Sequence, residues 1–129
     1  MKVGENDVAK GDDIEERLIR FAVRILKVCD SLPKTPAGKH VSDQLLRSGT
    51  AAAPNYAEGR SGESKRDFAH KLRIALKELN EARVWLKMII EAEMLSADLL
   101  QDLSRECDEL CRILHASIQT VQRNQPVKN

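Results

Sequence analysis

Residues 68–89, FAHKLRIALKELNEARVWLKMI, decide the fold class of this chain. Apolar side chains recur in this stretch alternately four and three residues apart, which places them on one face of an α-helix. They are Phe68, Leu72, Ala75, Leu79, Ala82, Leu86 and Ile89. Four further apolar residues widen the stripe: Leu76, Trp85, Met88 and Ile90. We expect a stripe this wide to be buried against more than two neighbours, inside the fold or across a subunit interface.

This helix begins after a short polar loop. Ser64 and Asp67 resemble a capping box, in which the serine accepts a hydrogen bond from a free N–H group of the first turn. The pattern predicts a helix over residues 65–94, the longest element of the chain. The loop before it, residues 59–62, carries two glycines and one arginine.

The preceding helix contains an internal proline and many small residues. Thr35 followed by Pro36 predicts an N-cap with proline at the first helical position, and Gly59 predicts a left-handed C-cap. Pro54 lies inside the helix and predicts a bend, because proline removes one backbone hydrogen bond. The buried stripe of this helix contains small residues that would let another helix approach closely. They are Ser48, Gly49, Ala51, Ala52 and Ala53.

Two more amphipathic helices complete the pattern. The first, over residues 13–31, carries the apolar residues Ile14, Leu18, Phe21, Ile25, Val28 and Leu32. The last begins after Ser96 and carries Leu100, Leu103, Cys107, Leu110, Leu114, Ser117 and Val121. We therefore expect a polar tail over residues 1–12, a helical domain over 13–123 and a C-terminal tail over 124–129.

The composition supports an all-α fold. A chain of 129 residues forms one domain, and 3% aromatic residues with only 6 Gly and 4 Pro argue against a β-sandwich or barrel. Four amphipathic helices joined by short loops predict an up-down-up-down antiparallel four-helix bundle.

The cysteines and the hydropathy indicate the compartment. Cys29, Cys107 and Cys111 are an odd number, and no apolar signal segment opens the chain. No run approaches the roughly 18 apolar residues that span a bilayer. We therefore expect a cytoplasmic protein that does not contact a membrane.

Catalytic and metal-binding motifs are scarce. The chain has no Walker loop, no Gly-x-Ser-x-Gly, no His-Glu-x-x-His and no Glu-x-x-His of a di-iron bundle. Cys107, Cys111 and His115 are spaced four apart on one helix and could offer three zinc ligands, although core packing explains them more simply. We expect no enzymatic activity, no metal, no cofactor and no small-molecule substrate.

The charge is unevenly distributed. The net charge is only +1, but residues 17–87 hold fifteen Lys and Arg against seven Asp and Glu. Arg60, Lys65 and Arg66 lie around the N-terminus of the long helix, where free N–H groups and the helix dipole suit a phosphate. Lys71, Arg73 and Lys77 continue the positive charge. This arrangement predicts salt-sensitive, sequence-tolerant contact with a nucleic-acid backbone.

Three segments resemble a known family. Residues 44–50 (QLLRSGT) and 55–59 (NYAEG), together with 64–68 (SKRDF), are similar to the signature of bacterial four-helix-bundle proteins related to those encoded by intervening sequences in large-subunit ribosomal RNA genes. The resemblance implies a left-handed bundle that assembles as a homo-oligomeric ring, typically a pentamer, without catalytic activity. A related branch, the accessory variability protein of diversity-generating retroelements, binds nucleic acid through a basic surface.

The resemblance and the charge pattern together predict a nucleic-acid-binding site for RNA or DNA. Its predicted residues are Arg20, Arg24, Arg47, Arg60, Lys65, Arg66 and Arg73. The alternative is a protein-interaction scaffold with no role in nucleic-acid binding, which the small-residue second helix and the acidic fourth helix would favour.

Overall fold

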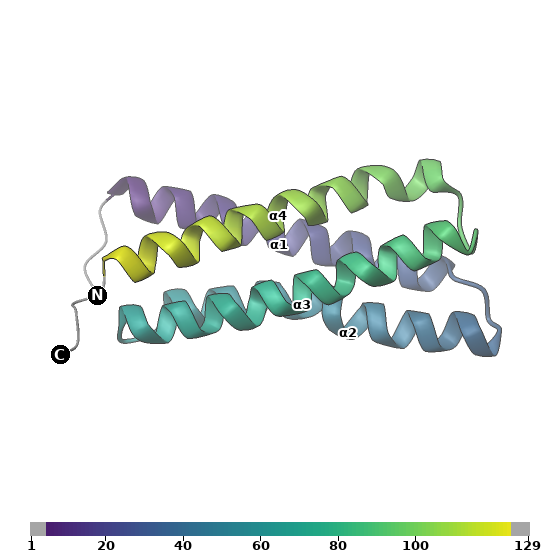
Figure 1. Ribbon diagram of the computed structural model, residues 1–129, viewed down its shortest axis with the longest axis horizontal. Helices are drawn as coiled ribbons and strands as arrows, with labels where there is room; N and C mark the ends of the chain where they lie inside the picture. Colours follow the sequence, from purple (N-terminus) through teal and green to yellow (C-terminus); the bar gives the residue numbers. More distant parts are fainter. Residues whose placement is uncertain (1–4, 125–129) are drawn as a thin grey trace.

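Four long antiparallel α-helices form the protein (Figure 1), and the computed structural model describes residues 5–124. The helices are α1 (Glu5–Ser31), α2 (Pro36–Arg60), α3 (Lys65–Glu91) and α4 (Ala97–Arg123). Each helix packs against the next one in sequence, and α1 and α4 close the bundle through the thinnest of its four interfaces. The predicted four-helix bundle is confirmed.

The apolar stripes meet in one continuous core. In α3, six residues of the predicted stripe are 0% exposed: Leu72, Ala75, Leu79, Ala82, Leu86 and Ile89. Complete burial of a Leu or Ile side chain stabilises the fold by about 1.5–3 kcal/mol, so this stripe is a main source of stability. In the part of the chain that the structure describes, none of the helices is long and apolar enough to cross a membrane.

The small residues of α2 bring two helices close together. A Cβ atom on Gly49 would lie 2.7 Å from Cγ2 of Ile25 in α1, which is closer than carbon atoms pack. Beside it, Ser48 is 0% exposed, and its hydroxyl donates a hydrogen bond to the Gln44 carbonyl at 2.8 Å. The expectation that small side chains permit close helix approach is confirmed here.

The first helix starts earlier than the sequence predicted. The predicted start was residue 13, but α1 begins at Glu5. Arg60 of α2 reaches across, donating hydrogen bonds to the Val8 carbonyl at 3.3 Å and to the Asp12 carboxylate at 2.8 Å. Contacts from another helix therefore support the first turns of α1. Capping residues near the start of a helix give no information on such long-range contacts.

The third helix ends earlier than predicted. It stops at Glu91 rather than near Met94, because Glu93 adopts the left-handed conformation with φ of 55°. The Met94 N–H then donates to the Ile89 carbonyl at 3.0 Å, the long hydrogen bond of a Schellman motif. Glycine usually occupies the left-handed position, so a glutamate there gave no stop signal in the sequence.

Gly59 does not form the predicted C-cap of α2. The helix continues through Arg60, its cap Ser61 has φ of −89°, and no described glycine has positive φ. Gly59 instead permits close approach to α3, since a Cβ atom there would lie 2.9 Å from Cδ1 of Phe68.

The predicted starts of the other three helices, α2, α3 and α4, agree with the structure. Thr35 accepts a hydrogen bond from the Gly38 N–H at 3.1 Å, and Ser64 accepts one from the Asp67 N–H at 3.0 Å. Ser96 caps α4 in the same way. At Pro54, α2 continues as a helix on both sides of the exposed proline ring.

Candidate nucleic-acid interface

The structure places the seven predicted site residues on three helices. Arg20 and Arg24 are exposed on α1, which packs against α2 and α4 and lies diagonally across the bundle from α3. Arg47 and Arg60 belong to α2, and the remaining three belong to α3. A single chain therefore does not gather all seven into one surface.

Arg47 joins α2 to α3. Its guanidinium donates to Glu78 at 2.8 Å and also to Glu81, which accepts a second hydrogen bond from the Trp85 indole at 3.1 Å. The hydrogen bonds from Arg47 and then from Trp85 lower the pKa of Glu81, so this carboxylate stays charged near neutral pH. Two carboxylates thus compensate the Arg47 charge.

Arg60 joins α2 to α1. Its side chain is 21% exposed and forms ion pairs with Asp12 at 2.8 Å and Glu15 at 3.2 Å. These contacts fix the end of the bundle and leave little of the guanidinium facing solvent. Arg60 and Arg47 therefore have structural roles in the isolated chain.

The outer face of α3 carries positively charged side chains at regular helical spacing. Four exposed residues follow one another at intervals of four, three and four: Arg66, His70, Arg73 and Lys77. We call them the basic stripe, which extends over about 16 Å at 1.5 Å per residue. Among the side chains of residues 8–124, no carboxylate forms an ion pair with Arg66, Arg73 or Lys77.

The basic stripe contains two of the seven predicted residues, Arg66 and Arg73. The sequence also pointed to Lys71 and Lys77, but Lys71 turns aside to pair with Glu58 at 2.8 Å. The sequence analysis did not predict His70 as a site residue, although it lies four residues after Arg66 and three before Arg73, on the same helix face. Polar residues at that period are the sequence signal that identifies this face.

The loop between α2 and α3 offers fewer free N–H groups than predicted. The N–H of Ser61 donates to the Ala57 carbonyl at 3.2 Å, and that of Gly62 donates to the Gly59 carbonyl at 3.2 Å. The Asp67 N–H is used by the Ser64 cap. Lys65 donates to the Asn124 carbonyl at 3.4 Å. Any anion binding here would depend on side-chain charge more than on backbone groups.

Cys107, Cys111 and His115 do not converge. The Cys107 thiol is 0% exposed and donates to the Leu79 carbonyl at 3.4 Å, while His115 is exposed. The contact with Cys111 and burial raise the pKa of Cys107. Among the described residues, no three His, Cys, Asp or Glu side chains are placed to hold a metal ion.

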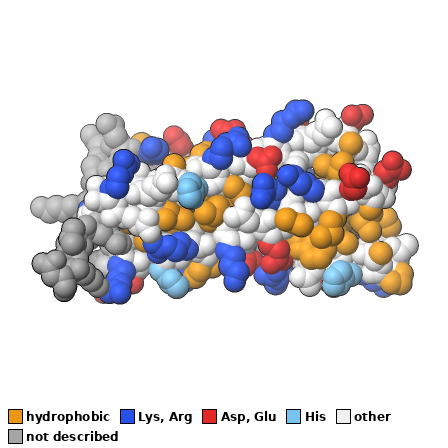
Figure 2. Space-filling view, in the orientation of Figure 1, with side chains coloured by type: hydrophobic (Ala, Val, Ile, Leu, Met, Phe, Trp, Pro, Cys, Tyr) orange, Lys and Arg blue, Asp and Glu red, His pale blue; other side chains and the backbone are white. Residues whose placement is uncertain are grey.

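Two groups of large apolar side chains remain exposed. On α1, Ile19, Val23 and Leu26 are 44–48% exposed and follow a helical period. On α2 and α3, Leu46, Val84 and Met88 are 39–47% exposed. Figure 2 shows hydrophobic side chains gathered toward the end of the bundle away from the chain termini, with Lys and Arg along the rest of that face.

Comparisons with known proteins give relatives of similar length. The family described as 23S rRNA-intervening sequence protein matches residues 12–116. A crystal structure from Bacteroides thetaiotaomicron, a protein of unknown function from the S23 ribosomal protein family, is 32% identical with a TM-score of 0.76. The match covers 81% of this chain and 97% of that one. No curated protein matches the chain.

Proposed function

Since the chain belongs to the 23S rRNA-intervening sequence protein family, we propose that it is a non-enzymatic, oligomeric bundle that binds the backbone of RNA or DNA. The basic stripe on α3 is the observation that carries the nucleic-acid part of this proposal. Its cations are exposed, lie on one helix face and lack carboxylate partners within the described residues.

Phosphate contact explains these cations better than fold stability does. Exposed Lys and Arg side chains add little stability by themselves, whereas neutralising phosphates releases counterions and produces strong binding at low salt. The basic stripe contains no Phe, Tyr or Trp, so the His70 ring is its one group for base stacking. We expect binding with little sequence preference and no catalytic turnover.

The nucleic-acid proposal is tested with two triple variants of equal charge change. Arg66→Glu, Arg73→Glu and Lys77→Glu remove the basic stripe, while Arg20→Glu, Arg24→Glu and Lys27→Glu remove exposed cations of α1. With labelled structured RNA and duplex DNA at two salt concentrations, we expect the α3 variant to bind about 100-fold more weakly. Its slope of log affinity against log salt for duplex should fall by about 3, one unit per lost contact.

The α1 variant is the control. It should retain most of the affinity, because α1 lies diagonally across the bundle from α3. Equal losses in both variants would show that binding follows net charge and not the basic stripe. Absence of salt-dependent binding by the unmodified protein would contradict the proposal and favour a protein-interaction scaffold.

The two exposed apolar groups support the oligomeric part of the proposal. They lie on different helices, so a contact between them would be heterologous and could close into a ring. The resemblance of the sequence to its family implies a pentamer. Covering both groups by neighbouring copies would also explain why the apolar stripe of α3 extends to Met88.

Single charges should break such an assembly. We expect Val23→Glu on α1 and Met88→Glu on α3 each to convert the oligomer to monomers in size-exclusion chromatography with light scattering, because both sides of a heterologous contact are needed. Leu99→Glu is the control, since Leu99 is 68% exposed and belongs to neither group. A monomeric unmodified protein, or an oligomer that survives both substitutions, would refute this interface.

A further inference from the structure

A cavity of about 470 Å³ is lined by residues of all four helices at the end of the bundle where the described chain begins and ends. Its volume falls in the range of small-molecule sites, which is about 300–1,000 Å³. The nucleic-acid proposal does not use this cavity.

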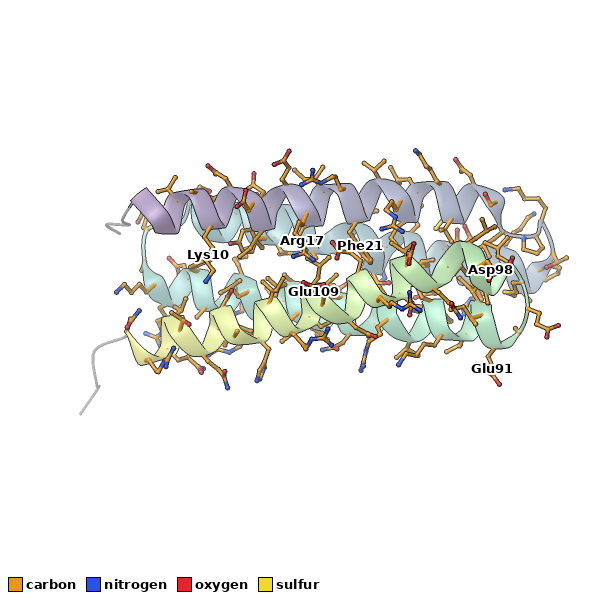
Figure 3. The ribbon with its side chains drawn as sticks, turned by 90° about the horizontal axis from the view of Figure 1, so that it is seen from above. Lys10, Arg17, Phe21, Glu91, Asp98 and Glu109 are labelled. Carbon is orange, nitrogen blue, oxygen red and sulfur yellow. The ribbon has the colours of Figure 1, made fainter. Side chains whose placement is uncertain are left out.

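The cavity exists because α1 and α4 separate toward this end. Arg17 joins the two helices near their middle, with ion pairs to Glu106 at 2.6 Å and Glu109 at 3.4 Å. Figure 3 shows Arg17 and Glu109 between α1 and α4, and these two helices lie farther apart on the side of Lys10 than on the side of Asp98. Beyond the bridge, α4 presents small side chains to the space, Ala116 and Ser117.

The residues that line the cavity are mostly apolar, with a few positively charged side chains among them. Apolar and aromatic groups make most of the wall, including Ile14, Tyr56, Phe68, Ile113 and Val121. Lys10, Arg60 and Lys65 also line the cavity, and none of the described lining residues is acidic. Asp12 and Glu15 compensate Arg60 from outside the cavity, while none of the carboxylates of residues 8–124, whose side chains the structure describes, pairs with Lys10.

Tyr56 adds a polar group to the apolar wall. Burial raises the pKa of its phenol to about 12, so the side chain remains a neutral O–H donor at physiological pH. An apolar space with a neutral hydroxyl, an excess of positive charge and no carboxylate is complementary to one ligand chemistry. That chemistry is an apolar chain or ring that ends in a single anionic group.

We propose that this cavity binds a small anionic amphiphile, with its apolar part along Ile14, Phe68 and Ile113 and its charged group near Lys10. The proposal does not depend on nucleic-acid binding. The cavity would bind this ligand without catalysing a reaction on it.

Isothermal titration calorimetry with sodium decanoate tests the proposal. We expect saturable binding with one ligand per chain, and at least about tenfold weaker binding of the neutral analogue 1-decanol or the cationic decyltrimethylammonium, a difference worth about 1.4 kcal/mol. Decanoate should also raise the thermal unfolding midpoint, because it binds only the folded chain.

Two pairs of variants locate the site. Ser117→Phe fills the cavity and should abolish decanoate binding, while Ser104→Phe, at another half-buried serine of α4, should not. Lys10→Glu should weaken binding about tenfold, and Lys34→Glu in the loop at the opposite end of α1 should leave it unchanged. Circular dichroism checks that each variant is folded.

The outcomes separate this proposal from the nucleic-acid proposal. Loss of decanoate binding in Ser117→Phe with unchanged RNA binding supports an independent ligand site. No saturable binding of decanoate, equal affinity for decanol, or unchanged binding in both Ser117→Phe and Lys10→Glu would overturn the proposal.

Discussion

Replacing Gly49 with leucine is expected to lower the free energy of unfolding by about 3 kcal/mol, at the upper end of ordinary overpacking. The first added carbon would lie 2.7 and 2.8 Å from the two γ-carbons of Ile25. Ile25 is 0% exposed and branched at Cβ, so it cannot turn away, and α1 would have to move off α2. Urea unfolding monitored by circular dichroism measures the change.

The sign of this result separates two effects. Leucine has the higher helix propensity, by close to 1 kcal/mol, so Gly49→Leu would stabilise α2 if packing were unimportant. Adding Ile25→Ala to Gly49→Leu should recover part of the loss, because the new side chain could use the vacated space. A stabilised single variant, or a double variant whose losses simply add, would show that α1 and α2 are not in tight contact at this point.

Replacing Pro54 with alanine is expected to raise the free energy of unfolding by about 2 kcal/mol. Proline inside a helix costs about 3 kcal/mol, because it lacks an N–H and its ring meets the carbonyl four residues earlier, that of Thr50. The greater freedom of alanine in the unfolded chain cancels roughly 0.4–1 kcal/mol of the gain. Pro54 is exposed, so little packing is lost.

The measurement is the thermal unfolding midpoint, which should rise by about 8 °C for a chain of this size. Pro36→Ala is the matched control, since Pro36 occupies the first position of α2, where the missing N–H has no helical partner. That substitution should leave the midpoint unchanged or lower it slightly. An equal rise in both variants, or a fall in Pro54→Ala, would contradict the explanation.

The helices were predictable from sequence wherever a local signal existed. The apolar period of α3 and the capping residues Thr35, Ser64 and Ser96 determine local structure, and the structure agrees with them. The errors occurred where a residue distant in sequence supports a helix, or where glycine does not mark the helix end, as at Gly59. Hydrogen bonds from Arg60 support the start of α1, and a glutamate takes the left-handed position after α3.

The candidate site was harder to predict for the same reason. Sequence shows that an arginine is present but not whether a carboxylate from another helix reaches it. Arg47 and Arg60 are paired across helix interfaces, whereas Arg66 and Arg73 face outward. The cavity depends on the divergence of α1 and α4, which no local pattern of either helix encodes.

The thin interface between α1 and α4 has a consequence for the order of folding. The other three interfaces join helices that follow one another, through loops of only four or five residues. Short loops lose little entropy on closure, so hairpins such as α2 with α3 can form early. Contacts between α1 and α4 join the two ends of the chain and would form last. The interface between α1 and α4 would then be the first to open in the native state. Partial unfolding would therefore expose the end of the bundle that holds the cavity before it exposes the core between α2 and α3.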